Sequence, residues 1–190
     1  MSKADLYAAM LAFWAPHIYK HYIETLAKLK ARYPGLKPLH DSAFPAISFN
    51  LGPQTATFEH TDHQNYAGGL CAVTAMGDFD PKVSGHLYLA ELKLVVEFPP
   101  GSTILLPSSL IHHGNTALKT TDRRYSCTSF AAGGLFRLVD QQFVLQEDMT
   151  KAQLKRFKAS QHARFIAALG KFSTPASLAS DHSQVFGPYA

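Results

Sequence analysis

The sequence predicts a mainly β protein with flanking helices, in which a double-stranded β-helix core (jelly-roll, cupin-like) is buttressed by N- and C-terminal helices. Short runs rich in Val, Ile, Thr and aromatic residues fill residues 43–140, and Gly, Pro and Asp separate these runs. Helical periodicity marks both ends of the chain. About eight short strands with regular turns are typical of a barrel or a double-sheet jelly roll.

Length and composition set the class of protein before any motif is considered. The chain has 190 residues, of which 46% are hydrophobic and 17% charged. A chain of this size buries roughly 70% of its unfolded surface, so we expect one domain over 1–190 that needs no disulfides. This composition excludes disordered, collagen-like and coiled-coil chains. Cys71 and Cys127 are too few for a disulfide scaffold or a Cys-rich zinc module, and we interpret them as reduced core thiols of an intracellular protein.

The N-terminal segment, residues 1–40, has the periodicity of a helix. We expect Pro16 to kink this helix or to split it in two, and the run Tyr33-Pro34-Gly35 to end it. One apolar stripe, with steps of three or four residues, consists of Tyr7, Leu11, Trp14, Ile18, Tyr22, Leu26 and Leu29.

The β core, residues 43–140, is divided into candidate strands by turn-forming residues. The main turns are Gly52-Pro53, the run from Gly77 to Pro81, and the run from Pro99 to Ser102. The candidate strands are Ala46–Leu51, Thr55–His60, Leu70–Met76, His86–Leu89, Leu92–Phe98, Thr103–Leu106, Leu110–His113 and Tyr125–Ala131.

A C-terminal helix is predicted over residues 148–171. Thr150, followed three residues later by Gln153, has the pattern of a capping box, and Gly170 is a candidate C′ stop. The remaining tail, 172–190, is rich in Ser, Pro and Ala, so we expect loose coil there.

Charge is unevenly distributed along the chain. Residues 1–40 hold six Lys/Arg against two Asp/Glu, residues 41–147 hold six against ten, and residues 148–190 hold six against two. Two basic flanks therefore enclose an acidic centre. Such flanks are explained either by two solvated helices or by a basic surface for a polyanion such as nucleic acid, and charge alone does not decide between them.

Two places in the β core carry residues suited to metal chemistry. His60 and Asp62 follow a predicted strand at positions i and i+2, so an imidazole and a carboxylate point to the same face. A further histidine comes from the pair His112-His113 after a later strand. Two histidines and one carboxylate form the facial triad of non-haem Fe(II) oxygenases, which leaves positions open for a chelating cosubstrate and dioxygen.

An anion-binding pair follows the distal histidine. Arg124 and Ser126 share a face if Tyr125 lies in a strand. A buried guanidinium beside a hydroxyl suits a carboxylate. The order H-x-D, distal His, R-x-S is the order that a 2-oxoglutarate-dependent oxygenase requires, with the Arg holding the distal carboxylate of 2-oxoglutarate.

Half of the chain, from Phe49 to Phe143, also resembles a known family. The stretch is similar to fungal, transposon-associated dioxygenases of the TET/JBP type, which are double-stranded β-helix enzymes that use Fe(II), 2-oxoglutarate and O2 to oxidise the methyl group of 5-methylcytosine or thymine in nucleic acid. The motifs that carry the resemblance are NLGPQT at 50–55, HTDHQN at 60–65, CAVTAMGDFDP at 71–81, LKLVVEFPPGSTILLPS at 92–108, HGN at 113–115 and RYSCTSFAAGGLFRLVD at 124–140.

The resemblance implies a role for each site residue. It selects His113 rather than His112 as the distal ligand, beside His60 and Asp62. It makes Arg124 and Ser126 the 2-oxoglutarate anchor. It places Asn65 where TET enzymes contact the target cytosine, and Phe130 where an aromatic side chain holds the flipped base. Two features depart from TET enzymes: no Cys-rich zinc region is present in this sequence, and Ala132 stands where they have a histidine.

The resemblance thus implies a dioxygenase that oxidises 5-methylcytosine in DNA to 5-hydroxymethylcytosine and beyond. We expect DNA as the partner, with RNA as the alternative, no membrane and no obligate protein partner, and a nuclear location. A 2-oxoglutarate oxygenase that hydroxylates a small molecule or a protein side chain would use the same residues, because a fold does not fix its substrate. A non-catalytic jelly-roll binding module is the third hypothesis.

Overall fold

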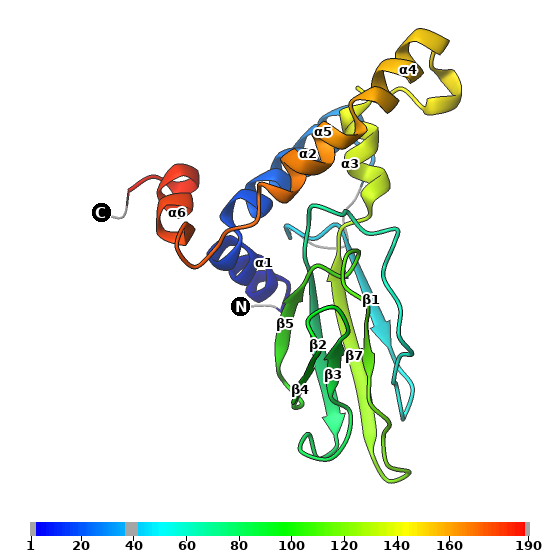
Figure 1. Ribbon diagram of the computed structural model, residues 1–190, viewed down its shortest axis with the longest axis vertical. Helices are drawn as coiled ribbons and strands as arrows, with labels where there is room; N and C mark the ends of the chain where they lie inside the picture. The colour runs from blue at the N-terminus through cyan, green and yellow to red at the C-terminus, as the bar shows by residue number, and fades with distance from the viewer. Residues whose placement is uncertain (1–2, 37–41, 189–190) are drawn as a thin grey trace.

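Two facing antiparallel sheets form the centre of the computed structural model, which describes residues 3–36 and 42–188 (Figure 1). The larger sheet has the strand order β1-β7-β2-β5, and the smaller has the order β4-β3-β6. This confirms a mainly β fold with flanking helices and a jelly-roll-like core. The strands are β1 (Ala46–Asn50), β2 (Cys71–Asp78), β3 (Leu87–Leu89), β4 (Leu94–Val96), β5 (Thr103–Leu106), β6 (His113–Asn115) and β7 (Arg123–Phe130).

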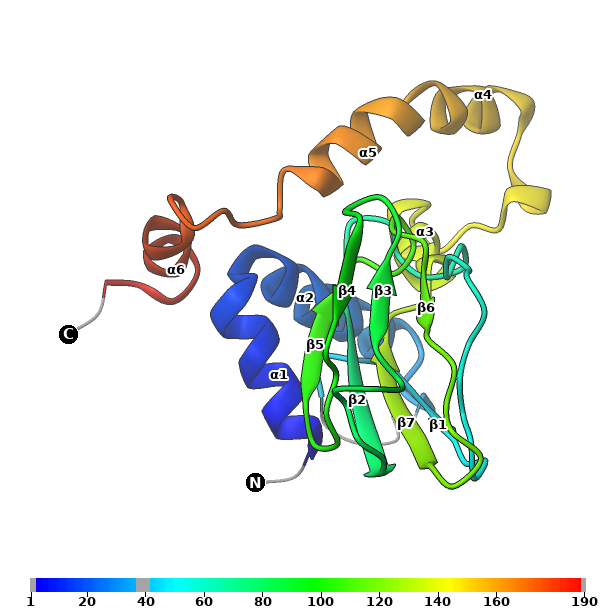
Figure 2. The same ribbon diagram turned by 60° about the horizontal axis from the view of Figure 1, so that its bottom comes forward.

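Helices cover one side of the sandwich and one end of it. In Figure 2, α1 and α2 lie beyond the larger sheet, on the side away from the smaller sheet, while α3, α4 and α5 lie at one end. In the described part of the chain, no helix combines the length and the apolar character needed to cross a bilayer. The helices are α1 (Lys3–Trp14), α2 (Pro16–Arg32), α3 (Gly133–Asp140), α4 (Lys151–Ala159), α5 (Gln161–Leu169) and α6 (Leu178–Phe186), with a 3-10 turn at Gln146–Asp148.

The central strand β7 separates the hydrophobic core from the cavity between the sheets. Successive side chains of a strand point to opposite faces. Cys127 accordingly packs among the buried helix residues Tyr7 and Tyr22. The alternate residues Arg124, Ser126, Thr128 and Phe130 line the cavity. One strand therefore anchors the helices with one face and builds the candidate site with the other.

The N-terminal helix is split at Pro16, as predicted, because a proline has no N–H to donate and fits the first turn of a helix. Helix α2 ends at Arg32, directly before the predicted stop. The prediction for Trp14 was wrong: its side chain is 57% exposed, and Ala15 at the break is buried instead. Residues 1–2 and 37–40 of the predicted segment lie outside the described residues.

The predicted strand Thr55–His60 is not a regular strand, and this is the main correction to the β core. Isolated bridges tie the segment to different sheets: Gln54, directly before it, pairs with Arg124 of β7, and His60, its last residue, pairs with His113 of β6. A segment that crosses between two sheets changes partner on the way, so it cannot form a continuous ladder.

The predicted strand Leu110–His113 is also displaced. Leu110 and Ile111 lie in a turn in which both backbone N–H groups donate to Pro107 O, and β6 begins only at His113. The other strands agree with the prediction to within a few residues.

Helix α3 lies inside the stretch that we predicted to be β core. It begins with Gly133-Gly134, which are poor helix formers, so its helical signal is weak. Tertiary packing stabilises it: Phe136 is 3% exposed and stacks on Tyr66 at 4.1 Å between ring centroids.

The C-terminal region contains three helices where we predicted one helix and a coil. The capping box of Thr150 and Gln153 is present at the start of α4. The predicted helix over 148–171 breaks at Ser160 into α4 and α5, and Gly170 is the C-cap of α5 in a right-handed conformation rather than a C′ residue.

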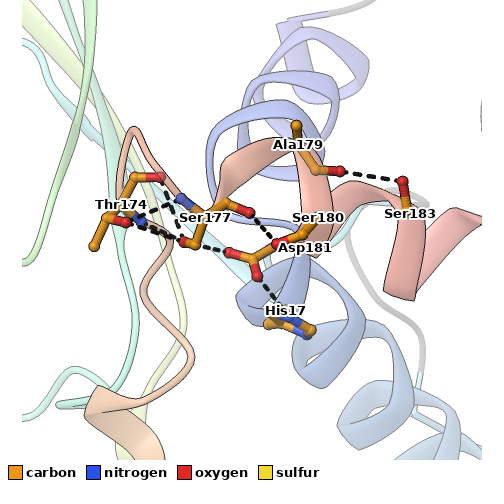
Figure 3. Close-up of polar contacts among 7 residues, drawn as sticks. All are labelled: His17, Thr174, Ser177, Ala179, Ser180, Asp181 and Ser183. Carbon is orange, nitrogen blue, oxygen red and sulfur yellow. Dashed lines mark hydrogen bonds and ion pairs between the residues drawn. The ribbon is translucent and has the colours of Figure 1, made fainter.

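The predicted coil over 172–190 contains α6, although its last two residues lie outside the described part. Figure 3 shows how this helix is held: Asp181 accepts a hydrogen bond from Ser177 Oγ and lies 3.5 Å from His17 Nε2 of α2. Composition predicted coil here because it could not reveal these contacts with a distant helix.

Candidate metal centre and its cavity

A cavity of about 670 Å³ lies between the two sheets. Its walls come from strands β1, β2, β3, β5, β6 and β7, from the crossing segment and from the loop 60–65 that follows it. All seven residues predicted for the site line this cavity: His60, Asp62, Asn65, His113, Arg124, Ser126 and Phe130. The fold therefore brings together residues that are spread over 71 positions of the sequence, from His60 to Phe130 inclusive.

His60, Asp62 and His113 form the candidate metal centre. One ligand atom from each residue lies within 4.8 Å of those of the other two, and in the described part of the chain no other group of His, Cys, Asp or Glu meets this criterion. The backbones of His60 and His113 are bonded to each other in both directions, at 3.1 and 3.0 Å. Asp62 is fixed in turn by its N–H, which donates to Ser108 O at 2.8 Å.

Backbone carbonyl groups orient both imidazole rings in the same way. Nδ1 of His60 lies 2.8 Å from Phe58 O, and Nδ1 of His113 lies 2.8 Å from Ile111 O. A carbonyl oxygen can only accept, so each Nδ1 carries the hydrogen and each Nε2 keeps its lone pair for a metal. The donor set of two imidazole nitrogens and one carboxylate oxygen fits a facial triad for Fe(II).

The neighbouring histidine, His112, belongs to the surface instead. Its backbone N–H donates to Glu91 Oε2 at 2.8 Å, and its ring pairs with the other carboxylate oxygen. This hydrogen bond raises the pKa of His112 and lowers the pKa of Glu91. Since His112 does not line the cavity, the structure places His113, and not His112, beside the other two candidate ligands.

Arg124 is a buried cation that lacks a counter-ion within the described residues. Its side chain is 2% exposed, and Nη1 donates to Thr55 O at 2.8 Å. Its Nε has no hydrogen-bond partner, and none of the ion pairs in the described ranges involves this residue. Burial lowers the pKa of the guanidinium. A buried charge of this kind is costly unless it is paired, so the site fits a carboxylate ligand.

Ser126 lies two residues further along β7, on the same face. Its hydroxyl accepts a hydrogen bond of 2.9 Å from Asn50 Nδ2 of the neighbouring strand β1. The crossing segment links the part of the cavity around Arg124 to the candidate metal centre. Thr55, whose carbonyl accepts from Arg124, lies five residues before His60.

Asn65 supports the metal centre directly. Its Nδ2 donates to Asp62 Oδ2 at 3.2 Å and to Ser108 Oγ at 3.1 Å. Asp62 therefore has one carboxylate oxygen held by Asn65, and its other oxygen, Oδ1, lies 3.4 Å from His60 Nε2. Phe130 lies at the end of β7 and lines the same cavity.

Sequence reasoning missed several groups that shape this site. Ser108 fixes Asp62 and Asn65, and Asn115 accepts from Thr57 Oγ1 at 3.1 Å beside the metal centre. Asn115 and Asn50 stand in the HGN and NLGPQT motifs, so a signal for them was present. The carbonyl groups of Phe58 and Ile111 belong to the backbone, and no residue type identifies them.

Comparison with known proteins gives distant similarity only. No protein-family model and no curated protein matches the chain. Among solved structures, it is similar to NgTET1 in complex with 5mC DNA, at 19% sequence identity and a TM-score of 0.45. That match covers 69% of this chain and 55% of the other, so this chain spans little more than half of the NgTET1 chain. It is also similar to a cupin 2 conserved barrel domain protein from Salinispora arenicola, at 14% identity, with 66% and 79% coverage and a TM-score of 0.34.

Proposed function

We propose that this protein is an Fe(II)- and 2-oxoglutarate-dependent dioxygenase that oxidises a methylated base in nucleic acid, with 5-methylcytosine in DNA as the preferred substrate. One observation carries the proposal. A single cavity contains both a cluster of two histidines and one aspartate, and a buried arginine without an acidic partner in the described residues. The first suits a cation and the second an anion, and an iron–2-oxoglutarate pair supplies both.

Each residue then has a defined role. His60, Asp62 and His113 hold the iron, and Arg124 with Ser126 binds the distal carboxylate of 2-oxoglutarate. Iron and 2-oxoglutarate, when bound, supply the activation of O2 that oxidises a C–H bond while the cosubstrate loses CO2 and becomes succinate.

The protein contributes mainly by holding these groups in place. Hydrogen bonds to backbone carbonyls fix the ring orientation of both histidines. Asn65 holds one oxygen of Asp62, which leaves the carboxylate a single preferred orientation. Metal sites depend on such outer partners for affinity and activity, commonly by 10- to 100-fold.

The choice of substrate rests on the motif resemblance to the fungal, transposon-associated TET/JBP dioxygenases. A base in a duplex must leave the stack to reach a cavity between two sheets, at a cost of a few kcal/mol. We propose that Phe130 stacks on the extruded base and that Asn65 contacts its polar edge, which offsets part of this cost. A nuclear location follows from a DNA substrate, and RNA remains the alternative.

Nucleoside mass spectrometry tests the proposal. The protein is incubated with Fe(II), 2-oxoglutarate and a duplex that contains 5-methylcytosine, and His113→Ala is compared with the adjacent control His112→Ala. We expect oxidised cytosine from the wild type and from His112→Ala, and none from His113→Ala, because only His113 lies in the metal cluster.

The alternatives give different results in the same assay. Succinate without oxidised base would reject 5-methylcytosine and favour another base, a small molecule or a protein side chain. If no succinate forms, and iron with 2-oxoglutarate gives no charge-transfer absorption band under anaerobic conditions, the protein is a binding module and the proposal is wrong.

A further inference from the structure

The chain between Met149 and Ser180 has charge of one sign only. It contains six Lys/Arg and no Asp or Glu. The six residues are Lys151, Lys155, Arg156, Lys158, Arg164 and Lys171. Five of the six lie in α4 and α5, which we call the basic arm, and Lys171 follows α5.

The outer helix of the basic arm is ordered without being packed. Helix α4 has no buried residue, and its four basic side chains are all exposed. An isolated helix of nine residues is marginal in water, so it requires other support. The capping box provides this at one end.

At the other end of α4, Arg164 of α5 joins the two helices. Its Nη1 donates to Phe157 O at 2.8 Å and also to Ser160 Oγ, and its guanidinium lies 3.8 Å from the centre of the Phe157 ring. These contacts hold an exposed cationic helix against α5, although no residue of the helix is fully buried.

The basic arm lies at the same end of the sandwich as the candidate metal centre. Figures 1 and 2 both show α3, α4 and α5 together at that end. The metal-binding loop meets the start of α3, where Gly133 N–H donates to Gln64 O at 2.8 Å and Asn65 bridges to Ala132. His63 and Gln64, at the rim of the cavity, are exposed on this side.

We propose that the basic arm binds the phosphate backbone of a duplex nucleic acid whose target base occupies the cavity. This inference rests on the proposed function and adds the surface that holds the substrate. A helix of nine residues is roughly 13 Å long, whereas duplex DNA carries one charge per about 1.7 Å of its axis. Several phosphates therefore lie within reach of α4. Contacts to phosphate carry no sequence information, so binding by the basic arm is independent of methylation.

An anionic lipid surface has the same sign of charge, but α4 is poorly suited to it. Interfacial helices insert an exposed apolar face. The exposed large apolar residues of the basic arm, Phe165 and Ile166, lie in α5, whose only Lys/Arg residue is Arg164. Helix α4 carries four Lys/Arg, and its large apolar residues, Leu154 and Phe157, are half-buried. Charge complementarity without an exposed apolar face on α4 favours a nucleic acid.

The experiment compares two triple variants of the full chain by fluorescence anisotropy with a short labelled duplex, across a series of salt concentrations and without iron. One is Lys155→Gln/Arg156→Gln/Lys158→Gln in α4. The matched control is Lys82→Gln/Lys119→Gln/Arg123→Gln, which removes three exposed charges near the start of β7, at the other end of the sandwich from α3.

We expect the α4 variant to lose at least about tenfold in affinity, equally for methylated and unmethylated duplex, and its salt slope to fall by about 0.9 for each phosphate contact removed. The control variant should bind within about twofold of the wild type, since its charges lie at the other end of the sandwich from α3 and the basic arm. Equal losses in the two variants, or wild-type binding by the α4 variant, would overturn the proposal. A third outcome is that binding to phosphatidylserine vesicles requires the basic residues of α4 whereas duplex binding does not. This outcome would assign the basic arm to a membrane surface and would reject the proposal that it binds nucleic acid.

A separate measurement distinguishes a failure of the basic arm to bind duplex from a failure of the proposed dioxygenase activity. The α4 variant should keep the charge-transfer band of iron with 2-oxoglutarate, because the basic arm contributes no residue to the cavity. Duplex binding that depends on α4, in a protein that oxidises no base, would support the basic arm and contradict the proposed function.

Discussion

Helices α2 and α4 carry four Lys/Arg residues each, but the structure uses them in opposite ways. Helix α2 buries five residues, among them Ile18, Tyr22 and Leu29, and its basic side chains lie on the remaining face. Helix α4 buries none. A run of basic residues thus forms the solvent-exposed face of a core helix in α2, whereas in α4 it belongs to a helix without a buried face. The difference lies in what each helix packs against, which charge patterning does not reveal.

The largest effect that this comparison predicts is on stability. Tyr22 is 1% exposed, and its hydroxyl donates to Leu70 O at 3.1 Å. We expect Tyr22→Ala to lower the free energy of unfolding by about 3–5 kcal/mol, because it leaves a cavity under the larger sheet. Phe157→Ala, the matched aromatic deletion in α4, should cost about 1 kcal/mol or less, mainly from the lost contact with Arg164.

Urea denaturation followed by circular dichroism measures both variants. The comparison fails if Phe157→Ala is as destabilising as Tyr22→Ala, because α4 would then fold as part of the core.

Elements with a strong local pattern could be predicted from the sequence, whereas elements that depend on distant contacts could not. Steps of three or four residues predicted α2, and Pro16 predicted its start. Helix α6 was missed because its anchors are distant: Asp181 meets His17, and His182 Nε2 lies 2.6 Å from Phe13 O. No periodicity in a Ser- and Ala-rich tail could show this.

The candidate site shows the same division between local patterns, which could be predicted, and long-range pairing, which could not. Residue types and their order predicted that His60, Asp62 and Arg124 line one site, because metal and carboxylate chemistry restricts which side chains can serve. The local H-G-N match selected His113. The crossing of Thr55–His60 between the sheets was not predictable, because alternating residues look the same whether a segment pairs with one strand or with two in succession.

The next prediction extends the contrast between buried and exposed groups to charge. Arg124 is buried without an acidic partner in the described residues, whereas Arg156 of α4 is exposed. We expect Arg124→Gln to weaken 2-oxoglutarate binding by roughly 10- to 100-fold, since charge-assisted hydrogen bonds contribute about 1.5–3 kcal/mol. Without ligand, its Tm should equal or exceed that of the wild type, because an uncompensated buried charge is removed.

Thermal denaturation with and without 2-oxoglutarate, in the presence of Fe(II), measures this. Arg156→Gln should keep the full ligand-induced rise in Tm. A rise that Arg124→Gln retains would show that the carboxylate binds elsewhere in the cavity.

A smaller effect concerns His21, a half-buried histidine of α2 whose ring centroid lies 5.4 Å from that of Tyr66 and 5.2 Å from that of Phe136. Burial, together with Lys171 and Lys28, lowers the pKa of His21 from its usual 6.5 to about 4. The folded state thus disfavours the proton, so this contribution to stability is complete above about pH 6.5 and is lost as the pH falls towards 4. We expect His21→Phe to unfold with a shallower loss of stability over that range.

Urea midpoints at several pH values between about 4 and 7 test this against the wild type. Parallel curves for the two proteins would mean that water reaches His21 and that Tyr66 and Phe136 do not shield its ring.

The smallest predicted effect tests whether α4 is independent of the core. In the capping box, Gln153 N–H donates to Thr150 Oγ1 at 3.3 Å and Thr150 N–H donates to Gln153 Oε1 at 2.9 Å. Thr150→Ala should cost about 1 kcal/mol, but only within α4. We expect faster amide hydrogen exchange over Lys151–Ala159 and an unchanged urea midpoint, because a helix without buried residues can unfold while the sandwich stays intact. A global loss of about 1 kcal/mol would instead couple α4 to the core. The fixed position of the basic arm would then depend on the stability of the whole protein, rather than on its own cap and on Arg164.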